Sequence, residues 1–167
     1  MPTELTTPRL HLDAWRDDDI DDYQTLVHER DPRTAAAPRG GRPTRDDLRE
    51  TILRLQASHT DTGIGLLVVR IADRFAGYCG LTAGRASLAE PELAYELLHM
   101  NQGNGYATEA ARAIVHAAAG TGRRRLWATV RSWNDASFHV LEKVGFERTD
   151  RTTTDDFGDT VWCTREL

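Results

Sequence analysis

The stretch NQGNGYATEA, from Asn101 to Ala110, joins a strand-like segment to an alanine-rich one. Gly103 and Gly105 can adopt backbone conformations that are unfavourable for other residues, and they carry no side chain that would keep a ligand away. The alanines that follow favour a helix. A glycine loop that runs into a helix leaves several N–H groups unpaired at the positive end of the helix dipole. The stretch therefore predicts a binding site for an anion, usually a phosphate.

Two common nucleotide-binding motifs do not fit this loop. No Gly-Lys-Ser/Thr sequence follows it, so a Walker-type site would lack its lysine and the hydroxyl that binds magnesium. A dinucleotide-binding G-x-G-x-x-G motif that started at Gly103 would need a glycine at position 108, where Thr108 stands. The predicted anion site is therefore of another kind.

The cysteines and histidines form no metal-binding pattern. Cys79 and Cys163 lie far apart in strand-like segments, outside any CxxC or Cys/His pattern, which indicates buried packing without a disulfide. The 6 histidines show no HExxH pairing. We therefore expect no metal site.

Apolar periodicity predicts the elements that must position the loop. The expected order is strand, two helices, three strands, helix, strand, helix and two strands. This is an α+β to α/β arrangement, with a mixed sheet covered by helices on both faces. The expected strands are 9–15, 64–71, 75–82, 92–99, 126–131, 146–153 and 160–166, and the expected helices begin at Asp17 and Thr44 or span 106–119 and 135–144.

Length and composition indicate one globular domain, 1–167. A chain of 167 residues can bury about 70% of the surface that it exposes when unfolded. The formal net charge of −5 argues against a nucleic-acid partner, which would require a basic face. The N-terminus lacks a signal-peptide pattern, and no apolar run approaches the ~18–20 residues of a membrane span. We therefore expect a cytoplasmic protein that binds neither nucleic acid nor membranes.

Two motifs resemble those of the GNAT superfamily of acyl-CoA-dependent N-acetyltransferases. Gln102, Gly105 and Ala107 match the Q-x-x-G-x-A pattern of its motif A. The segment NDASFHVLEKVGFE, from Asn134 to Glu147, is similar to a signature of the RimJ/RimL-type branch, whose relatives acetylate the N-termini of ribosomal proteins. The opening TPRLHLDAW is similar to that branch as well, so the resemblance covers nearly the whole chain. It implies a GNAT-type fold with a central mixed, mostly antiparallel sheet flanked by helices.

The resemblance implies acetyl-CoA as co-substrate and predicts where it binds. The loop amides from about Gln102 to Ala107 would hold the coenzyme A pyrophosphate. The strand 92–99 would splay from its neighbour, so that its free backbone groups bind the pantetheine amides and the thioester carbonyl. Asn134 would reach the pantetheine from the other side, and its side chain also suits a helix cap. The expected coenzyme-binding residues are Leu97, Leu98, Gln102, Gly103, Asn104, Gly105, Tyr106, Ala107, Thr108 and Asn134.

Direct acyl transfer to an amine in a ternary complex needs no covalent enzyme intermediate. The sequence is consistent with this, since it has no recognisable nucleophilic Cys or Ser-His arrangement. Many family members protonate the departing thiolate with a Tyr four residues before the Gly-Phe pair, where this chain has Leu141. The RimJ/RimL-type pattern has a Ser three residues after the Asn, so Ser137 is the expected hydrogen-bond donor to the thiolate. The other interpretation of Ser137 is a small residue that allows close packing.

The general base remains open among four candidates. Glu96 lies on the splayed strand, where related enzymes sometimes carry a catalytic carboxylate, and we expect it to be catalytic. Its rivals are His99, just beyond the strand, and Asp155 or Asp156 in the late turn. Each carboxylate also has a simpler interpretation as a solvated surface acid. His139 is expected to lie on the surface.

The acceptor is expected to be a primary amine, on a protein N-terminus or a small molecule. Trp133 and the basic loop Pro38–Pro43 would wall its site. The acidic start of the first helix, Asp17–Asp22, would attract a cationic amine or simply be solvated. The alternative function is a regulatory module that binds acyl-CoA without turnover, for which the missing Tyr at Leu141 is the argument. An acyl donor other than acetyl-CoA and a homodimer are both compatible with the resemblance.

Overall fold

A computed structural model describes residues 1–33 and 42–167 of the chain. Most of the predicted acceptor wall at 38–43 lies outside the described residues. The described residues form an 8-stranded sheet with the strand order β1-β2-β3-β4-β5-β6-β8-β7. Neighbouring strands are antiparallel except β5 and β6, which are parallel. The strands are β1 Leu5–Thr6, β2 His11–Asp13, β3 Leu66–Ile71, β4 Arg74–Thr82, β5 Glu92–Leu97, β6 Arg125–Arg131, β7 Glu147–Asp155 and β8 Gly158–Glu166.

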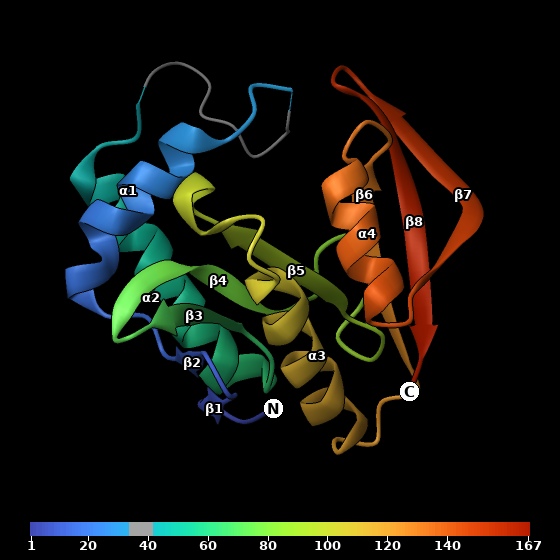
Figure 1. Cartoon of the computed structure of the whole chain (residues 1–167), viewed down its shortest axis with the longest axis horizontal. Coiled ribbons are helices and arrows are strands. Elements are labelled where there is room, and N and C mark those ends of the chain that lie inside the picture. Colours follow the sequence, from blue (N-terminus) through green and yellow to red (C-terminus); the bar gives the residue numbers. More distant parts are fainter. Residues whose placement is uncertain (34–41) are drawn as a thin grey trace.

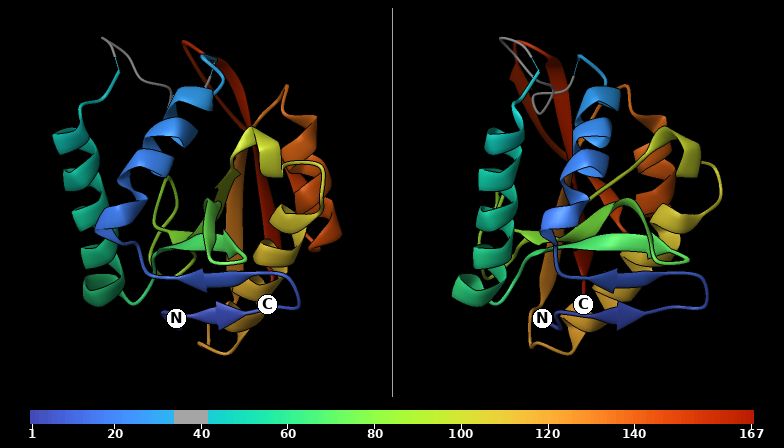
Figure 2. Two further views of the ribbon diagram at one scale, coloured as in Figure 1. Left: turned by 60° about the vertical axis from the view of Figure 1, so that its left-hand side comes forward. Right: turned by 90° about the vertical axis from the view of Figure 1, so that its left-hand side faces the viewer.

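Helices cover both faces of the sheet (Figures 1 and 2). The alternation of side chains along β3 explains why, because Leu67 and Val69 enter one core and Val68 enters the other. The first core also contains the alanine-rich face of α3 and two side chains of α4, and the second contains the apolar faces of α1 and α2. The helices are α1 Ile20–Glu29, α2 Arg45–Thr62, α3 Tyr106–Ala119 and α4 Asp135–Lys143. The predicted mixed sheet with helices on both faces is confirmed.

The helix boundaries follow from local capping. Thr44 precedes α2 and forms a capping box with Asp47, in which the Asp47 N–H donates to Thr44 Oγ1 over 3.2 Å and the Thr44 N–H donates to the Asp47 carboxylate over 2.8 Å. Gly63 ends the helix in the left-handed conformation, with a φ of 71°. The predicted start of this helix at Thr44 is therefore confirmed as its N-cap.

The acidic segment before α1 is not simply solvated. Asp19 is buried, and its carboxylate accepts hydrogen bonds from the Arg70 guanidinium over 2.8 and 3.0 Å. Arg70 also donates to Asp13 over 2.8 Å, so one buried guanidinium joins β3, β2 and the 3₁₀ turn that precedes α1. A buried charge needs such partners. Asp19 therefore has a structural role in this ion pair.

Several strand boundaries differ from the prediction. The first predicted strand, 9–15, is reduced to β2 at His11–Asp13, and the short strand β1 was not predicted. The predicted strand 92–99 ends at Leu97, because a 3₁₀ turn follows at His99–Asn101. The final hairpin extends closer to its turn than expected, since its polar residues pair across β7 and β8. Period-two alternation cannot detect a two-residue strand or a strand that ends in a 3₁₀ turn.

The parallel strands β5 and β6 diverge almost from their first residues. Their pairing is limited to Glu92 opposite Trp127, with one further bond from the Trp127 N–H to the Pro91 carbonyl of 2.9 Å. The Glu92 carboxylate lies at this point and accepts from the Thr129 hydroxyl over 2.8 Å. Beyond Glu92, β5 stays paired only with β4, and β6 only with β8. The sheet therefore opens into a V between β5 and β6.

Candidate active site

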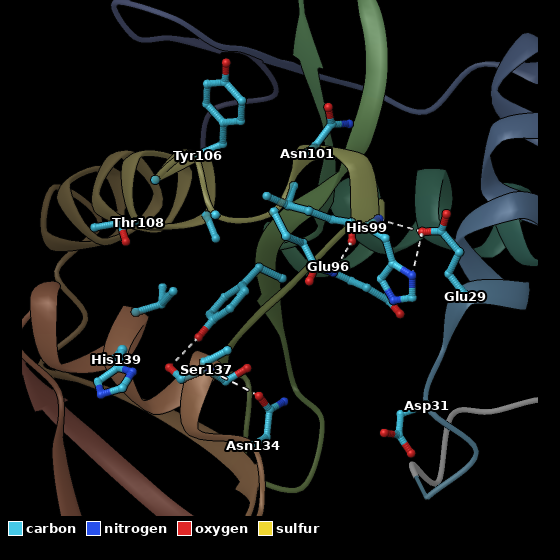
Figure 3. A pocket seen from close by; sticks show the side chains of 18 of the residues that line it. Glu29, Asp31, Glu96, His99, Asn101, Tyr106, Thr108, Asn134, Ser137 and His139 are labelled. Atoms are coloured by element: carbon cyan, nitrogen blue, oxygen red, sulfur yellow. Dashed lines mark hydrogen bonds and ion pairs between the residues drawn. The ribbon is translucent and has the colours of Figure 1, made fainter.

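A cavity of about 500 Å³ lies at the open end of this V. Figure 3 shows Asn134 and Ser137 on one side of it and Glu96, His99 and Glu29 on the other. The glycine loop and the start of α3 form a third wall, which contains Tyr106 and Thr108. The wall residues thus come from α1, β5, the glycine loop with α3, and α4. Of the predicted coenzyme-binding and catalytic residues, those that line the cavity are Glu96, Leu97, Gln102, Gly103, Gly105, Tyr106, Ala107, Thr108, Asn134 and Ser137.

The glycine loop has the backbone conformation that an anion site requires. Gly103 and Gly105 have φ angles of 77° and 78°, in the left-handed region that favours glycine. Gly105 is the N-cap of α3, and no side chain caps the helix there. The first intrahelical bond runs from the Glu109 N–H to the Gly105 carbonyl over 3.1 Å. The N–H groups of the residues between them therefore have no partner within the helix and point to the loop side.

Arg9 holds this loop in place, which the sequence did not reveal. Its Nε donates to the Glu109 carboxylate over 2.7 Å, and its Nη1 donates to the Asn104 carbonyl over 3.0 Å. Its guanidinium also lies 4.7 Å from the centre of the Tyr106 ring. Burial alone would raise the pKa of Glu109, but hydrogen bonds from Thr7 and Arg9 hold that pKa below its usual value. Glu109 therefore stays ionised and bound to Arg9.

Two of the predicted coenzyme-binding residues do not line the cavity. The Leu98 N–H donates to the Ala76 carbonyl of β4 over 2.9 Å, and its side chain is buried with α1 and α2 on the other face of the sheet. Asn104 turns its side chain back into its own loop, where it donates to the Gln102 carbonyl over 2.9 Å. The prediction that the backbone N–H of Leu98 is free is therefore wrong.

The backbone of Leu97 is directed differently. Antiparallel pairs alternate between hydrogen-bonded and non-hydrogen-bonded positions. Because Leu98 is bonded to β4, the N–H and C=O of Leu97 and of Tyr95 are directed toward the open side of the V. The Leu97 carbonyl accepts from the Gln102 side chain over 2.9 Å, which links β5 to the glycine loop.

Asn134 and Ser137 lie at the start of α4. The Asn134 side-chain oxygen accepts from the Ser137 N–H over 3.1 Å, which makes Asn134 the N-cap of the helix. The Oγ of Ser137 has no hydrogen-bond partner among the described residues. Leu141, at the position where many family members have a Tyr, is buried in the core under α4. A hydroxyl group that can donate to a ligand is therefore present at Ser137 and absent at Leu141.

Tyr95 is a further hydroxyl of the cavity that the sequence interpretation missed. Its hydroxyl donates to the Ser137 carbonyl over 3.0 Å, and burial raises the pKa of Tyr95, so the phenol stays protonated. The alternation along β5 was the available signal, since it placed Tyr95 on the face opposite Glu96. That face is the one on which α3 and α4 pack.

Glu96 is held tightly by Arg30, which directly follows α1. Arg30 Nε donates to both carboxylate oxygens of Glu96, over 2.9 and 3.0 Å, and its Nη2 donates over 2.8 Å. Burial first and the charge of Glu96 second raise the pKa of the Tyr78 phenol, which lies opposite Glu96 in the β4–β5 pair. Glu96 is therefore ordered and paired at the edge of the cavity.

The other candidate bases are placed very differently. His99 lines the cavity, and its backbone N–H donates to the Glu29 carboxylate over 2.7 Å. Asp155 and Asp156 lie at the β7–β8 turn and do not line the cavity. Hydrogen bonds from the Arg131 side chain and then from the Phe157 amide lower the pKa of Asp155 to about 2. The structure thus places only Glu96 and His99, of the four predicted bases, beside the cavity.

Trp133 also lines the cavity. The guanidinium of Arg33 lies 4.0 Å from the centre of one of its rings, and Arg33 also donates to Asp31, over 2.9 Å from its Nε. Trp133 is therefore placed beside the cavity as predicted. His139 is exposed, as predicted, and also lies at the cavity rim.

Other site types find little support in the described residues. No group of three or more His, Cys, Asp or Glu side chains within residues 1–33 and 42–167 could hold a metal ion. Cys79 and Cys163 are free and buried, as predicted. In the same ranges, every helix is too short or too polar to cross a membrane.

Comparison with known proteins identifies the family. A family model for an acetyltransferase (GNAT) domain matches residues 9–147. An acetyltransferase from Agrobacterium tumefaciens is 25% identical, with a TM-score of 0.79 over 100% of this chain and 95% of that chain. RimL, a ribosomal L7/L12 alpha-N-protein acetyltransferase in complex with coenzyme A, is 15% identical, with a TM-score of 0.81 over 99% of this chain and 97% of that chain.

RimJ from Mycobacterium smegmatis, in complex with a CoA-disulfide, is 20% identical, with a TM-score of 0.77 over 94% of this chain and 81% of that chain. No curated protein matches the sequence. The resemblance inferred from the two motifs is thus confirmed by the family model, and the neighbouring folds include both RimL and RimJ. The chain belongs to the GNAT acetyltransferase family, in which acetyl-CoA is the co-substrate.

Proposed function

We propose that the protein transfers an acetyl group from acetyl-CoA to a primary amine, directly and within a ternary complex. The observation that carries the proposal is the cavity in the V between β5 and β6, with the uncapped N-terminus of α3 at one end and ionisable side chains at the other. This arrangement gives the phosphates and the reacting thioester separate places in one cleft. No covalent enzyme intermediate is required.

The chain's own groups suffice to bind acetyl-CoA in this cleft. The uncapped N–H groups from Gly105 to Thr108 face the position of the pyrophosphate, where the helix dipole favours negative charge. The Leu97 backbone, directed into the V, is placed to bond the pantetheine or the thioester carbonyl. Asn134 lies on the opposite wall and completes the pantetheine site. Gln102 and Gly103 lie in the same loop, which is the reason for assigning both to coenzyme binding.

Ser137 is the group that meets the leaving thiolate. Its hydroxyl has no partner among residues 1–33 and 42–167, and the residue lines the cavity. A hydroxyl that is free before the reaction can donate to the thiolate as its charge develops. Tyr95, bonded to the Ser137 carbonyl, fixes the first turn of α4 that carries this hydroxyl.

The acceptor binds at the end of the cavity that contains Glu96, His99 and Trp133. Both a protein N-terminus and a small primary amine are compatible with the proposal. One structural neighbour, an acetyl transferase from Salmonella typhimurium, modifies the N-terminal serine of the 50S ribosomal subunit protein L7/L12. That neighbour supports an N-terminal amine as the first class of acceptor to test.

The test begins with calorimetric titration of the protein with acetyl-CoA and with free coenzyme A. Thiol release is then measured against a panel of small amines and peptides with free N-termini. Coenzyme binding with amine-dependent thiol release is the expected result. Binding without release across the panel would support the alternative regulatory module, and failure to bind either ligand would refute the proposed co-substrate site.

A further inference from the structure

We propose that His99 is the general base of the transfer and that Glu29 is the positioning residue that holds its imidazole. The inference rests on the proposed acetyl transfer and deepens it, since it assigns the proton acceptor that the sequence left open. His99 lies on the 3₁₀ turn after β5, and Glu29 is the last residue of α1. Figure 3 shows the two side chains next to each other beside the cavity.

Glu96, which the sequence favoured as the base, is committed to an ion pair. Both of its carboxylate oxygens accept hydrogen bonds from Arg30, at 2.8–3.0 Å. The pair is shielded, with side-chain exposures of 12% for Arg30 and 24% for Glu96. Proton uptake by Glu96 would require this shielded ion pair to be broken, which is unfavourable. Glu96 therefore serves as a fixed charge that orients the acceptor and does not take up its proton.

The two aspartates of the β7–β8 turn are unsuited to the role by position and by basicity. Asp155 is engaged by Arg131, whose Nη1 and Nη2 donate to its two oxygens over 2.8 Å each. With a pKa lowered to about 2 by Arg131 and the Phe157 amide, Asp155 is too weak a base for an ammonium group. Asp156 does not line the cavity. Neither aspartate can reach the acceptor.

His99 has the accessibility and the chemistry that the others lack. Its side chain is 63% exposed while the residue lines the cavity, so an acceptor amine can reach the ring. Histidine is the side chain that changes charge between pH 5 and 8. The Nδ1 atom faces Glu29, 4.0 Å from the nearer carboxylate oxygen, which leaves Nε2 for the acceptor. The ring nitrogens thus have separate roles.

Glu29 is fixed where it can stabilise the imidazolium. The carboxylate oxygen near Nδ1 also accepts from the His99 backbone N–H over 2.7 Å, so it cannot swing away from the ring. In the described residues, no Arg or Lys side chain pairs with Glu29. Besides Glu29, the charged residues that line the cavity among the described residues include the Arg30–Glu96 pair, Asp31 and Lys143.

Protons and bonds balance in the proposed step. His99 Nε2 accepts one proton from the acceptor ammonium, and the resulting neutral amine attacks the thioester carbonyl. The C–N bond forms and the C–S bond breaks as the tetrahedral intermediate collapses. The second amine proton passes to the thiolate, with Ser137 as the hydrogen-bond donor to sulfur. The imidazolium releases its proton to water, so the products are the amide, coenzyme A and one proton.

The test uses two acceptor probes that differ in their need for a base. At pH 7, glycinamide is mostly an ammonium ion and methoxyamine is neutral. At saturating acetyl-CoA, and after subtraction of the uncatalysed reaction, His99→Gln is expected to slow transfer to glycinamide about 100-fold. Transfer to methoxyamine is expected to change less than about threefold, because no proton must be removed before attack.

Glu29→Gln supplies the test of the positioning role. The amide oxygen still accepts from the His99 N–H, and only the negative charge is lost. A loss of about tenfold on glycinamide, with methoxyamine nearly unaffected, is expected. His139→Gln is the matched control, because His139 is another exposed histidine at the cavity rim, and it should leave the ratio of the two rates unchanged.

The outcomes separate this inference from the proposed function. If the wild type acetylates the probes and His99→Gln slows both equally, or neither, His99 is not the base. If the wild type binds coenzyme A but transfers to neither probe nor to any amine of the panel, the proposed function fails and this inference fails with it. Melting temperatures of the variants exclude unfolding as the cause. They should match that of the wild type, because His99 and His139 are exposed and a Gln at position 29 can still accept from the His99 N–H.

Discussion

The hydroxyl of Tyr95 donates to the backbone carbonyl of Ser137 over 3.0 Å and joins β5 to α4 across the V. The two strands that bound the V have separated at this level, so the bond connects walls that no backbone ladder joins. Loss of one such buried hydrogen bond typically destabilises a structure by about 1 kcal/mol. Here the bond also sets the position of the helix turn that carries the proposed thiolate donor.

Tyr95→Phe is therefore expected to lower kcat about fivefold and to change the KM for acetyl-CoA little. The phenylalanine ring keeps the apolar packing and removes only the hydroxyl. Steady-state kinetics with an amine acceptor measures the two parameters separately. A large rise in KM with kcat unchanged would mean that Tyr95 acts on coenzyme binding and not on Ser137.

Ser137→Ala tests the thiolate donor directly. The substitution keeps the N–H that Asn134 caps and the carbonyl that Tyr95 contacts, so α4 should remain in place. We expect coenzyme A to bind with unchanged affinity while kcat falls about 100-fold, the lower end of what a proton-transfer group contributes. Ser132→Ala, at an exposed serine outside the cavity, is the control. Equal effects of the two variants would rule out a special role for Ser137.

Because the pKa of Asp155 is lowered in the folded protein, we expect the stability of the fold to depend on pH. Its pKa in the folded protein is lowered to about 2, first by the Arg131 side chain and then by the Phe157 amide, from about 3.9 in an unfolded chain. A lowered carboxyl pKa stabilises the fold above the unfolded value, and this stabilisation is lost as the pH falls from about 4 to 2. Asp155→Asn should thus be less stable than the wild type at pH 7, and most of this difference should be gone at pH 2.

Urea unfolding at a series of pH values measures this difference. Asp156→Asn serves as the control for the general loss of one acidic charge from the same turn. A stability difference between Asp155→Asn and the wild type that persists undiminished at pH 2 would contradict the assignment of the Arg131–Asp155 pair.

The predictability of the fold differs between its parts. The glycine loop and α3 follow from local rules, because left-handed glycines and an alanine-rich helix need no distant partner. The prediction that β5 splays from its neighbour came from the family resemblance. It could not be derived from the apolar periodicity of the sequence. Strand β1 escaped prediction because its two residues are held by pairing with β2. Pairing between segments that are far apart in the sequence leaves no local sequence pattern from which a strand could be predicted.

The same difference between local patterns and long-range contacts explains which site residues could be predicted from the sequence. Ser137 and Asn134 were identified because both lie in one continuous motif. Arg9, Arg30 and Glu29 were missed, since each meets its partner across the sheet or between elements: Arg30 and Glu96 are 66 residues apart in sequence, and Arg9 and Glu109 are 100. When only the sequence is known and not these contacts, each of the three residues looks like an ordinary surface charge. Leu98 was misplaced because its N–H returns to β4.

Arg9 offers a test of how the loop is held. Without Arg9, the Glu109 carboxylate would keep its charge at the start of α3, close to the proposed phosphate site. Arg9→Ala should weaken coenzyme A binding about tenfold, which corresponds to about 1.4 kcal/mol. Adding Glu109→Gln should restore part of the loss, because the repulsive charge is then removed. Calorimetric titration of both variants measures this coupling, and no recovery in the double variant would show that Arg9 acts only through the loop backbone.

Gly105→Val tests the phosphate site itself. Gly105 has a φ of 78°, which is strained for valine, and a side chain at this position would project beside the N–H groups at the start of α3. We expect coenzyme A binding to be abolished or reduced more than about 100-fold.

The Gly122→Val variant is the control for backbone strain. Gly122, beyond the other end of α3, has a φ of 76° and open space where a Cβ would lie, so the same substitution imposes the same backbone strain far from the cavity. Coenzyme A should bind normally to Gly122→Val, and normal binding to Gly105→Val as well would remove the loop from the proposed site.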